Sequence, residues 1–217
     1  MKETRCRVVV LGSGRGSNFE ALTGAAGSTW QIVAVGSDKR DAPLLAKAAR
    51  RDIPTFCCEP AEYPDRAAHD AALATAVAQQ APNLVLLAGY MRLLGPAMLE
   101  PWSGRLLNVH PSLLPAWPGL HTHERVLRAG DATHGATVHF VTAELDRGPR
   151  IVQGQLAVQS TADAATLAAR VRRLEHCIYP KAVDWYANGR LKLEKDMAVL
   201  DGNPLADPVI IEETECV

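Results

Sequence analysis

An asparagine and a histidine that lie two positions apart have side chains that could do chemistry. Asn108 and His110 belong to the apolar segment Leu106 to His110, which is typical of a strand. Residues i and i+2 of a strand project from the same face, and Pro111 favours an extended backbone at His110. Open α/β sheets bind ligands at strand ends, so this amide and imidazole form a candidate catalytic pair. A purely structural histidine is the alternative.

A second candidate is a glycine-rich turn near the N-terminus. The apolar segment Val8 to Leu11 predicts a buried strand, and Gly12, Gly14 and Gly16 follow it. Residues without a Cβ atom let backbone N–H groups and a helix N-terminus approach an anion. Ser17 and Asn18 are suited to cap the helix that follows. We expect a phosphate-binding turn, with tight packing as the alternative.

The spacing of these glycines bears on the ligand. A dinucleotide fingerprint places its third glycine three positions after its second, whereas these glycines alternate. Asp38, about twenty residues further on, keeps a nicotinamide cofactor open as an alternative. No lysine follows the last glycine of the turn, which excludes a nucleoside-triphosphate P-loop.

Asp146 stands just before a Gly-Pro pair, where turn formation alone can explain an aspartate. His121, His123 and His139 could be combined into a metal site. Their spacing lacks the i, i+4 pattern of a helical ligand pair and no carboxylate accompanies them, so we predict no metal. No serine lies in a nucleophile-elbow context, which disfavours an acyl-enzyme.

The composition is that of a soluble globular protein. Of 217 residues 47% are hydrophobic, and 23 basic residues against 24 acidic ones give a net charge of -1. These values exclude a disordered or fibrous chain. Without a basic excess, neither nucleic acid nor a membrane surface is the expected partner. We expect small-molecule ligands.

The cysteines and the N-terminus indicate a cytoplasmic protein. The segment Val8 to Leu11 is too short for the core of a signal peptide, and no apolar run is long enough to span a bilayer. The cysteines lack the paired spacing of metal ligands, and we interpret them as reduced thiols. They are Cys6, Cys57, Cys58, Cys177 and Cys216.

Strand and helix patterns alternate over roughly the first hundred residues. After the first strand and helix, strands are predicted at 31–35, 54–57, 83–88 and 106–110, and helices at 43–51 and 64–80. This order predicts an α/β fold with a mostly parallel twisted sheet and flanking helices, Rossmann-like in its N-terminal half.

The pattern changes after Pro111, where a proline-rich loop begins. The segment Gly135 to Val141 alternates, so that Thr137 and His139 share one face. Residues 151–158 predict its partner strand. We therefore expect an antiparallel addition to the sheet in the C-terminal half.

The last part of the chain predicts one long helix and a tail. The helix covers residues 161–188, and Pro180 is expected to bend or interrupt it. From Asp207 the residues are acidic, and we expect a loosely held tail.

Taken together, these motifs resemble the glycinamide ribonucleotide formyltransferase family, folate-dependent enzymes of purine synthesis. The resemblance covers residues 6–206 and rests on the segments 14–18, 88–94, 107–122 with its Asn-x-His-Pro-Ser-Leu-Leu-Pro core, 134–141, 146–149 and 175–180. It implies one formyltransferase domain over residues 1-206, with a phosphate-binding half (1-105) and a catalytic and folate-binding half (106-206). An acidic tail (207-217) follows.

The resemblance implies transfer of a formyl group from 10-formyltetrahydrofolate, as co-substrate, to the amine of glycinamide ribonucleotide. The matching catalytic residues are Asn108, His110 and Asp146. The implied ribonucleotide contacts are Gly16, Ser17 and Asn18 for the phosphate and Glu175 for the remainder. The implied folate contacts are Arg66, Met91, Arg92, Leu93, Leu94, Val141, Ala143 and Asp146, with Thr137, His139 and His121 in support. A cytoplasmic monomer or homodimer is expected.

Two departures from the family pattern leave the catalytic residues untouched: Ala116, where the family often has lysine, and Ala143, where it often has aspartate. A transfer-RNA formyltransferase or a folate deformylase would need further domains, which this length does not accommodate. The remaining alternatives are an N-formyltransferase acting on a sugar nucleotide and a nicotinamide-binding oxidoreductase.

Overall fold

The computed structural model describes residues 5–159 and 163–216. They form two compact units, which divide between Leu107 and Asn108. The α/β fold expected from the sequence is confirmed, with a mostly parallel sheet, flanking helices and an antiparallel addition in the C-terminal half. None of the helices in the described part of the chain has the length and apolarity needed to cross a membrane.

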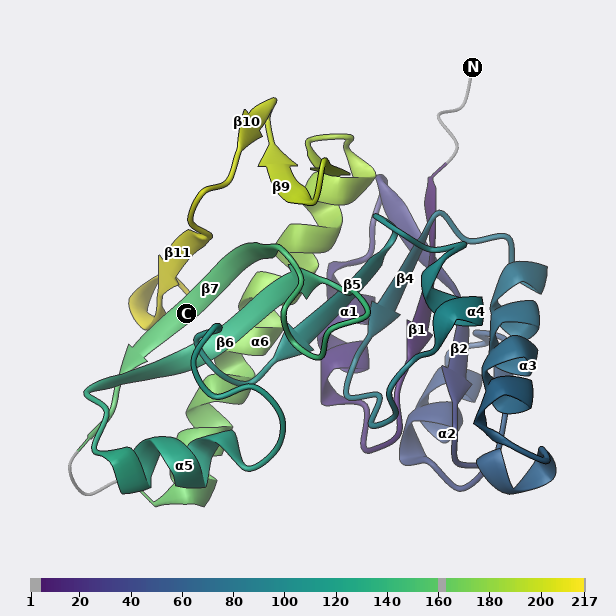
Figure 1. Ribbon diagram of the computed structural model, residues 1–217, viewed down its shortest axis with the longest axis horizontal. Coiled ribbons are helices and arrows are strands. Elements are labelled where there is room, and N and C mark those ends of the chain that lie inside the picture. The colour runs from purple at the N-terminus through teal and green to yellow at the C-terminus, as the bar shows by residue number, and fades with distance from the viewer. Residues whose placement is uncertain (1–4, 160–162, 217) are drawn as a thin grey trace. The chain divides into compact units, whose positions relative to one another are not determined.

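The first unit is built from alternating strands and helices. Its strands lie in the order β4-β1-β2-β3 and are all parallel (Figure 1). The elements are β1 (Cys6–Leu11), α1 (Ser17–Ala25), β2 (Trp30–Ser37), α2 (Pro43–Ala49), β3 (Thr55–Cys57), the 3-10 helix η1 (Pro60–Glu62), α3 (Arg66–Gln79), β4 (Leu84–Leu87) and α4 (Pro96–Leu99).

The core of this unit explains why its central strands are continuously apolar. Val8 to Leu11 of β1 and Leu84 to Leu86 of β4 have no exposed surface, as expected for strands that are covered on both faces. In the parallel register Leu11 lies beside Gly36 and beside Leu87. The glycine-rich turn therefore leaves the sheet at the carboxyl ends of its strands, the edge where ligands bind in such folds.

The start of α1 differs from the sequence prediction. Neither Ser17 nor Asn18 caps the helix, because Ser17 is already its first residue and Gly16 is the N-cap, without a side-chain hydrogen bond. Gly16 has a left-handed backbone with φ 76°, a conformation that glycine adopts at no steric cost. The turn therefore enters the helix one residue earlier than a serine cap would require.

The second unit is organised around an antiparallel pair. β6 pairs with β7, and α6 packs against both strands (Figure 1). A separate small sheet has the antiparallel order β10-β9-β8. The elements are α5 (Thr122–Ala129), β6 (Thr133–Phe140), β7 (Arg150–Ala157), α6 (Ala164–Ala187), β8 (Leu191–Glu194), β9 (Met197–Leu200), β10 (Asn203–Pro204), β11 (Val209–Glu212) and the 3-10 helix η2 (Glu213–Glu215). β5 (Leu106–His110) includes the division between the units.

Pro180 does not interrupt the long helix. α6 continues through it to Ala187, although proline lacks the N–H that a helix interior uses. Ile178, Tyr179 and Ala182 around it are fully buried, so packing of the apolar face holds the helix together here. Residues 161 and 162, at the start of the predicted helix, lie outside the described residues.

The C-terminal segment is held more firmly than predicted. β11 pairs in parallel with β7, so the expectation of a loosely held tail is wrong. The prediction that all cysteines are reduced thiols is also wrong, because Cys177 of α6 and Cys216 form a disulfide. Spacing along the sequence could not show this pairing, since the two residues lie 39 positions apart.

Gly135 provides a test of the packing between β6 and β7. A Cβ atom at this position would collide with the carbonyl oxygen of Gly154 and lie 2.8 Å from Leu113 Cδ2. We expect Gly135→Ala to lower the free energy of unfolding by about 1–3 kcal/mol, as overpacked core positions do. Urea denaturation measures this change.

Gly24→Ala is the matched control for this experiment. Gly24 lies in α1, and a Cβ atom there would meet nothing within 4 Å. Alanine in a helix interior is better than glycine by roughly 0.5–1 kcal/mol, so this variant should be as stable as the wild type or more so. Equal losses in the two variants would contradict the packing argument.

Candidate active site

Four polar side chains of the second unit form a cluster, in which Asn108 is half-buried and the other side chains are buried. Asn108 and His110 come from β5, His139 comes from β6, and Asp146 lies in the loop between β6 and β7. His110 Nδ1 is 3.4 Å from Asp146 Oδ2, and His139 Nε2 is 3.9 Å from Asp146 Oδ1. The Asp146 side chain is only 7% exposed. The structure therefore brings together the three residues that the sequence singled out as catalytic, with His139 beside them.

Asp146 is held in place by its own loop and by the loop after β5. Its backbone is left-handed, with φ 54°, a conformation that aspartate tolerates better than most residues. The backbone N–H of Gly119 donates a 2.9 Å hydrogen bond to Asp146 Oδ2. A carboxylate with one oxygen fixed by an amide presents its other oxygen in a defined direction.

His110 has an acceptor opposite each ring nitrogen. Nε2 lies 3.0 Å from the carbonyl oxygen of Trp117, and Nδ1 faces the carboxylate of Asp146. An imidazole with two N–H groups can donate to both acceptors, whereas a neutral ring can donate to only one. The two acceptors therefore fix the orientation of the ring beside Asp146.

His139 fixes the orientation of Asn108. Its Nδ1 lies 2.8 Å from the carbonyl oxygen of Phe140, so this nitrogen carries the hydrogen and donates. Nε2 is then an acceptor, and it receives a 3.1 Å hydrogen bond from Asn108 Nδ2. Burial lowers the pKa of the His139 ring to about 4 and keeps the ring neutral. One amide hydrogen of Asn108 remains free of this bond and can be offered to a substrate.

Buried neutral histidines make stability depend on pH. Burial lowers the pKa values of both His134 and His139 to about 4, whereas histidine in an unfolded chain titrates near 6.5. The unfolded state therefore binds more protons between these values, and stability decreases as the pH falls through this window. We expect a loss of roughly 2 kcal/mol per ring between pH 6.5 and 5.

Urea denaturation across this pH range measures the effect. A His134→Asn variant should show a smaller loss than the wild type, whereas an Asn variant of the exposed His121 should match the wild type. Stability that stays constant from pH 6.5 to 5 would contradict the burial argument.

Thr137 organises the loop that follows β5. Its hydroxyl donates to the carbonyl oxygen of Ser112 at 2.7 Å and accepts from the backbone N–H of Leu114 at 3.0 Å. Gln153 Nε2 donates to the same hydroxyl at 2.9 Å. These bonds fix the first part of the loop that supplies the Trp117 carbonyl and the Gly119 amide. The alternating strand thus supports the catalytic cluster through Thr137 and His139.

In the first unit, the predicted phosphate residues lie on the glycine-rich turn. Gly16, Ser17 and Asn18 form the N-cap and the first residues of α1. The backbone N–H of Ser13 donates to the carbonyl oxygen of Gly89, and Ser13 Oγ accepts from the N–H of Met91. The turn is therefore tied to the segment that follows β4.

The glycines of this turn also serve packing, the alternative that the sequence left open. A Cβ atom on Gly16 would lie 2.8 Å from Leu44 Cδ1. Close contact with Leu44 of α2 thus requires a residue without a side chain.

The predicted folate residues of the first unit form an exposed segment. Met91 and Leu93 are 67% and 56% exposed, so this segment presents two large apolar side chains to the solvent. Arg66 Nη2 donates a 3.2 Å hydrogen bond to the carbonyl oxygen of Leu93. The structure thus places Arg66 beside this segment. Arg92 is exposed and Leu94 is half-buried.

The other predicted site residues of the second unit are partly accessible. Val141 and Glu175 are half-buried and Ala143 is exposed. His121 is exposed and is the N-cap of α5, with a left-handed backbone and no side-chain cap. It does not join the catalytic cluster.

An open cavity of about 550 Å³ lies on the loop that carries Asp146. Residues 142–144 and 147–150 form one part of its lining, and residues 196–198, 205, 206 and 208 form the other. Ala143 belongs to this lining, whereas Asn108, His110 and Asp146 do not. The cavity is therefore separate from the catalytic cluster.

The histidines considered for a metal site have other partners. His123 Nδ1 is 3.0 Å from His134 Nε2, so these two rings share a hydrogen bond, and His139 bonds to Asn108 instead. Within residues 5–159 and 163–216, no group of three His, Cys, Asp or Glu side chains is placed to hold a metal ion.

The sequence did not predict two backbone groups of the site. The carbonyl oxygen of Trp117 and the N–H of Gly119 hold His110 and Asp146. Both are backbone groups, so the residue type carries no signal for them. Gln153 and Ser112 were also missed, because single polar residues in strands and loops have many other uses.

Comparison with known proteins identifies the family. A family model described as formyl transferase matches residues 6–183. The phosphoribosylglycinamide formyltransferase of Escherichia coli (strain K12) is 44% identical over 201 residues, which cover 91% of this chain and 95% of the relative. That of Bacillus subtilis (strain 168) is 37% identical over 180 residues, covering 82% and 92%.

A solved structure gives the same result. The structure of the phosphoribosylglycinamide formyltransferase of Coxiella burnetii has a TM-score of 0.91 and 43% sequence identity, and the match covers 95% of this chain and 100% of that chain. The resemblance inferred from the sequence motifs is confirmed. The chain belongs to the formyl transferase family.

Proposed function

We propose that the chain transfers the formyl group of 10-formyltetrahydrofolate to the amine of glycinamide ribonucleotide, as a step of purine biosynthesis. The observation that carries the proposal is the cluster of Asn108, His110, His139 and Asp146. It combines hydrogen-bond donors with a carboxylate, in a chain of the formyl transferase family. Relatives named phosphoribosylglycinamide formyltransferase at 44% and 37% identity support this acceptor.

Formyl transfer needs two kinds of group. The glycine amine attacks the formyl carbon, a C–N bond forms, and the formyl oxygen becomes negative while the amine nitrogen becomes positive. Donors must stabilise the oxygen and a base must accept a proton from the nitrogen. The bond from carbon to the folate nitrogen then breaks, and that nitrogen takes up a proton.

The cluster contains a group for each task. In our proposal the free amide hydrogen of Asn108 donates to the formyl oxygen. The His110 ring also donates to it, by exchanging its present contact with the Trp117 carbonyl for the substrate. Asp146 accepts the amine proton, directly or through one water, and the proton returns to the departing folate nitrogen. Asp146 also orients His110, with 3.4 Å between Oδ2 and Nδ1. His139 positions Asn108 and need not touch the substrate.

The substrate contacts follow from the family resemblance. We propose that Gly16, Ser17 and Asn18 bind the phosphate, because backbone N–H groups at a helix N-terminus favour an anion. Glu175 is assigned to the rest of the ribonucleotide. The exposed apolar side chains of Met91 and Leu93 suit the folate ring system. The proposed folate residues are completed by Arg66, Arg92, Leu94, Val141, Ala143 and Asp146.

The domain organisation and the setting of the enzyme are also proposals. We assign residues 1-206 to one formyltransferase domain, with a phosphate-binding half (1-105) and a catalytic half (106-206). A cytoplasmic location and a monomeric or homodimeric state fit an enzyme with small-molecule substrates.

A spectrophotometric assay of deformylated folate tests the function. The rate is measured with 10-formyltetrahydrofolate, first with glycinamide ribonucleotide and then without it. We expect product only when the amine is present. Equal rates in both arms would indicate a hydrolase, and activity restricted to an amino sugar nucleotide would indicate the related N-formyltransferases.

Titration with NADH tests the oxidoreductase alternative. Leu44 lies against Gly16 of the glycine-rich turn, and the alternating glycines do not match a dinucleotide fingerprint. We expect no change in NADH fluorescence at concentrations that saturate dinucleotide-binding enzymes.

A further inference from the structure

The last strand of the chain has little apolar contact of its own. β11 pairs with β7 over four residues, from Val209 beside Val152 to Glu212 beside Gln155. Of these four residues only Ile211 is buried, at 3% exposure, whereas Ile210 is 44% exposed. An edge strand with one buried side chain gains little from burial.

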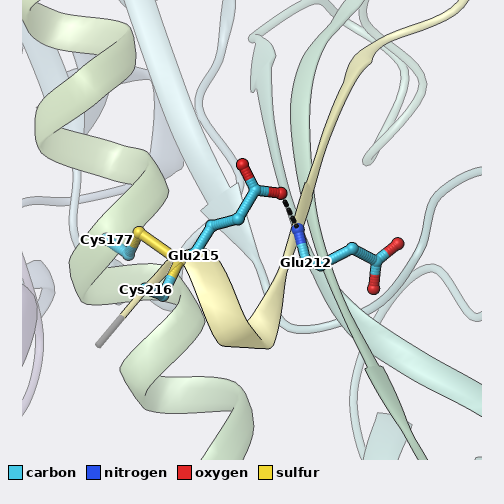
Figure 2. Close-up of a disulfide and its surroundings, with 4 residues drawn as sticks. All are labelled: Cys177, Glu212, Glu215 and Cys216. Carbon is cyan, nitrogen blue, oxygen red and sulfur yellow. Dashed lines mark hydrogen bonds between the residues drawn. A yellow bond between two sulfur atoms is a disulfide. The ribbon is translucent and has the colours of Figure 1, made fainter.

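One ion pair adds to the attachment. Arg170 of α6 donates from Nε to Glu213 Oε1 at 3.0 Å, and its Nη2 contacts the other carboxylate oxygen. The two side chains are 18% and 33% exposed, and the bidentate geometry makes this pair stronger than an ordinary surface ion pair. It is nevertheless a noncovalent contact at the edge of the fold. The N–H of Glu212 donates to Glu215 Oε1, a bond within the segment itself (Figure 2).

The disulfide is the one covalent attachment seen for this segment within the described residues. Figure 2 shows Cys177 of α6 joined to Cys216, directly after η2. The Cα atoms are 5.6 Å apart, a usual separation for a disulfide. Both residues are half-buried, so the disulfide is not enclosed in the core.

The other cysteines of the described chain differ from this pair. Cys6, Cys57 and Cys58 are all unbonded. Cys58 is buried, and Cys6 and Cys57 are half-buried. Burial raises the pKa values of Cys6 and Cys57 to about 11. The thiolate is the form that attacks a disulfide, so these thiols exchange slowly at neutral pH.

We propose that Cys177 and Cys216 form a thiol–disulfide exchange site, at which a small disulfide of the glutathione class fastens the C-terminal strand β11 and the corresponding thiol releases it. The site concerns the attachment of one strand and is independent of formyl transfer. Its proposed role is to control, reversibly, how stably β11 stays paired with the edge strand β7.

The exchange balances without another reactant. The thiolate of Cys216 attacks one sulfur of the small disulfide, forms a mixed disulfide and expels one small thiol. The thiolate of Cys177 then attacks the Cys216 sulfur and expels the second small thiol. Two protein thiols are oxidised, one small disulfide is reduced to two thiols, and the two protein protons end on these thiols. Release follows the same steps in reverse.

Redox titration of the full-length protein tests the proposal. The protein is equilibrated in buffers with different ratios of reduced to oxidised glutathione, and alkylation followed by mass spectrometry gives the bonded fraction of Cys177 and Cys216. Hydrogen exchange then measures protection of the Val209–Glu212 amides. We expect the bonded fraction and the amide protection to rise together as oxidised glutathione increases. Both should fall again when reduced glutathione is restored.

Thermal unfolding gives a second readout. A disulfide that closes a loop of about 39 residues should raise Tm by about 5–15 °C in a chain of this size. Cys216→Ser should have the lower Tm in oxidising buffers and should match the wild type in the most reducing buffer. Cys57→Ser, which removes an unbonded thiol, should respond to glutathione as the wild type does.

Three results would overturn the proposal. The pair could stay reduced at the highest proportion of oxidised glutathione, or stay bonded in the most reducing buffer, which would make it an inert structural bond. Protection of the Val209–Glu212 amides could also remain the same in the bonded and reduced forms. None of these readouts requires enzymatic activity, so failure of the proposed function leaves the test intact.

Discussion

Replacing Asp146 by Asn is expected to lower kcat by roughly 10²- to 10⁴-fold, the range for loss of a general base. Asparagine has nearly the same shape, and its side-chain oxygen can still accept the hydrogen bond from Gly119 N–H. It cannot accept a proton from the amine, and it places no carboxylate 3.4 Å from the His110 ring. The loss should therefore fall mainly on kcat, with KM for both substrates changed much less.

Steady-state kinetics with purified protein measure this effect. Asp196→Asn is the matched control, because Asp196 is an exposed residue in the turn between β8 and β9 with a similar left-handed backbone, φ 61°. The control should retain wild-type kcat, and both variants should keep the wild-type Tm to within a few degrees. An Asp146→Asn enzyme with kcat near that of the wild type would refute the assignment of the base.

Loss of the Asn108 amide has the second largest expected effect. Asn108→Ala removes a donor to the formyl oxygen and should reduce kcat by roughly 10²- to 10³-fold, as deletion of one oxyanion donor does in other enzymes. The variant also leaves His139 Nε2 without the 3.1 Å bond from Asn108. The rate effect should therefore come with a modest loss of stability.

A double-mutant cycle separates the roles of Asn108 and His139. If His139 acts by holding the amide, then adding His139→Gln to Asn108→Ala should slow the reaction little further, because the group that His139 positions is already gone. Independent, multiplying effects on kcat would indicate that His139 touches the substrate itself. An Asn108→Ala enzyme within threefold of the wild-type kcat would contradict the donor role.

Much of the architecture was predictable because hydrophobic patterns report burial directly. Val8 to Leu11 and Leu84 to Leu87 are continuously apolar, as strands covered on both faces must be. The alternation in β6 correctly placed Thr137 and His139 on one face, where both bond to polar groups near β5. Here local sequence and tertiary packing require the same residues.

The C-terminal part was less predictable for physical reasons. The hairpin between β8 and β9 turns at Lys195 and Asp196, both with positive φ, without the glycine that normally marks such turns. The acidic composition after Asp207 concealed the strand β11, whose pairing depends on the free edge of β7. The disulfide between Cys177 and Cys216 depends on the same tertiary arrangement.

The candidate site shows a similar division. The spacing of Asn108 and His110 indicated a shared face, because strand geometry fixes it. Asp146 looked like a turn residue on local grounds, and only the resemblance to a family marked it as catalytic. The Trp117 carbonyl and the Gly119 amide could not be predicted, since the path of a loop decides where backbone groups point.

The hydrogen bond between His139 and Asn108 also determines which end of the Asn108 amide, the nitrogen or the oxygen, faces the His139 ring. Because Nε2 of this ring can only accept, rotating the amide by half a turn would set its oxygen lone pairs against those of the nitrogen. Asn108 is thus confined to one orientation before any substrate arrives. The developing charge on a formyl oxygen would meet a dipole that is already aligned, so little reorganisation energy is spent during the reaction.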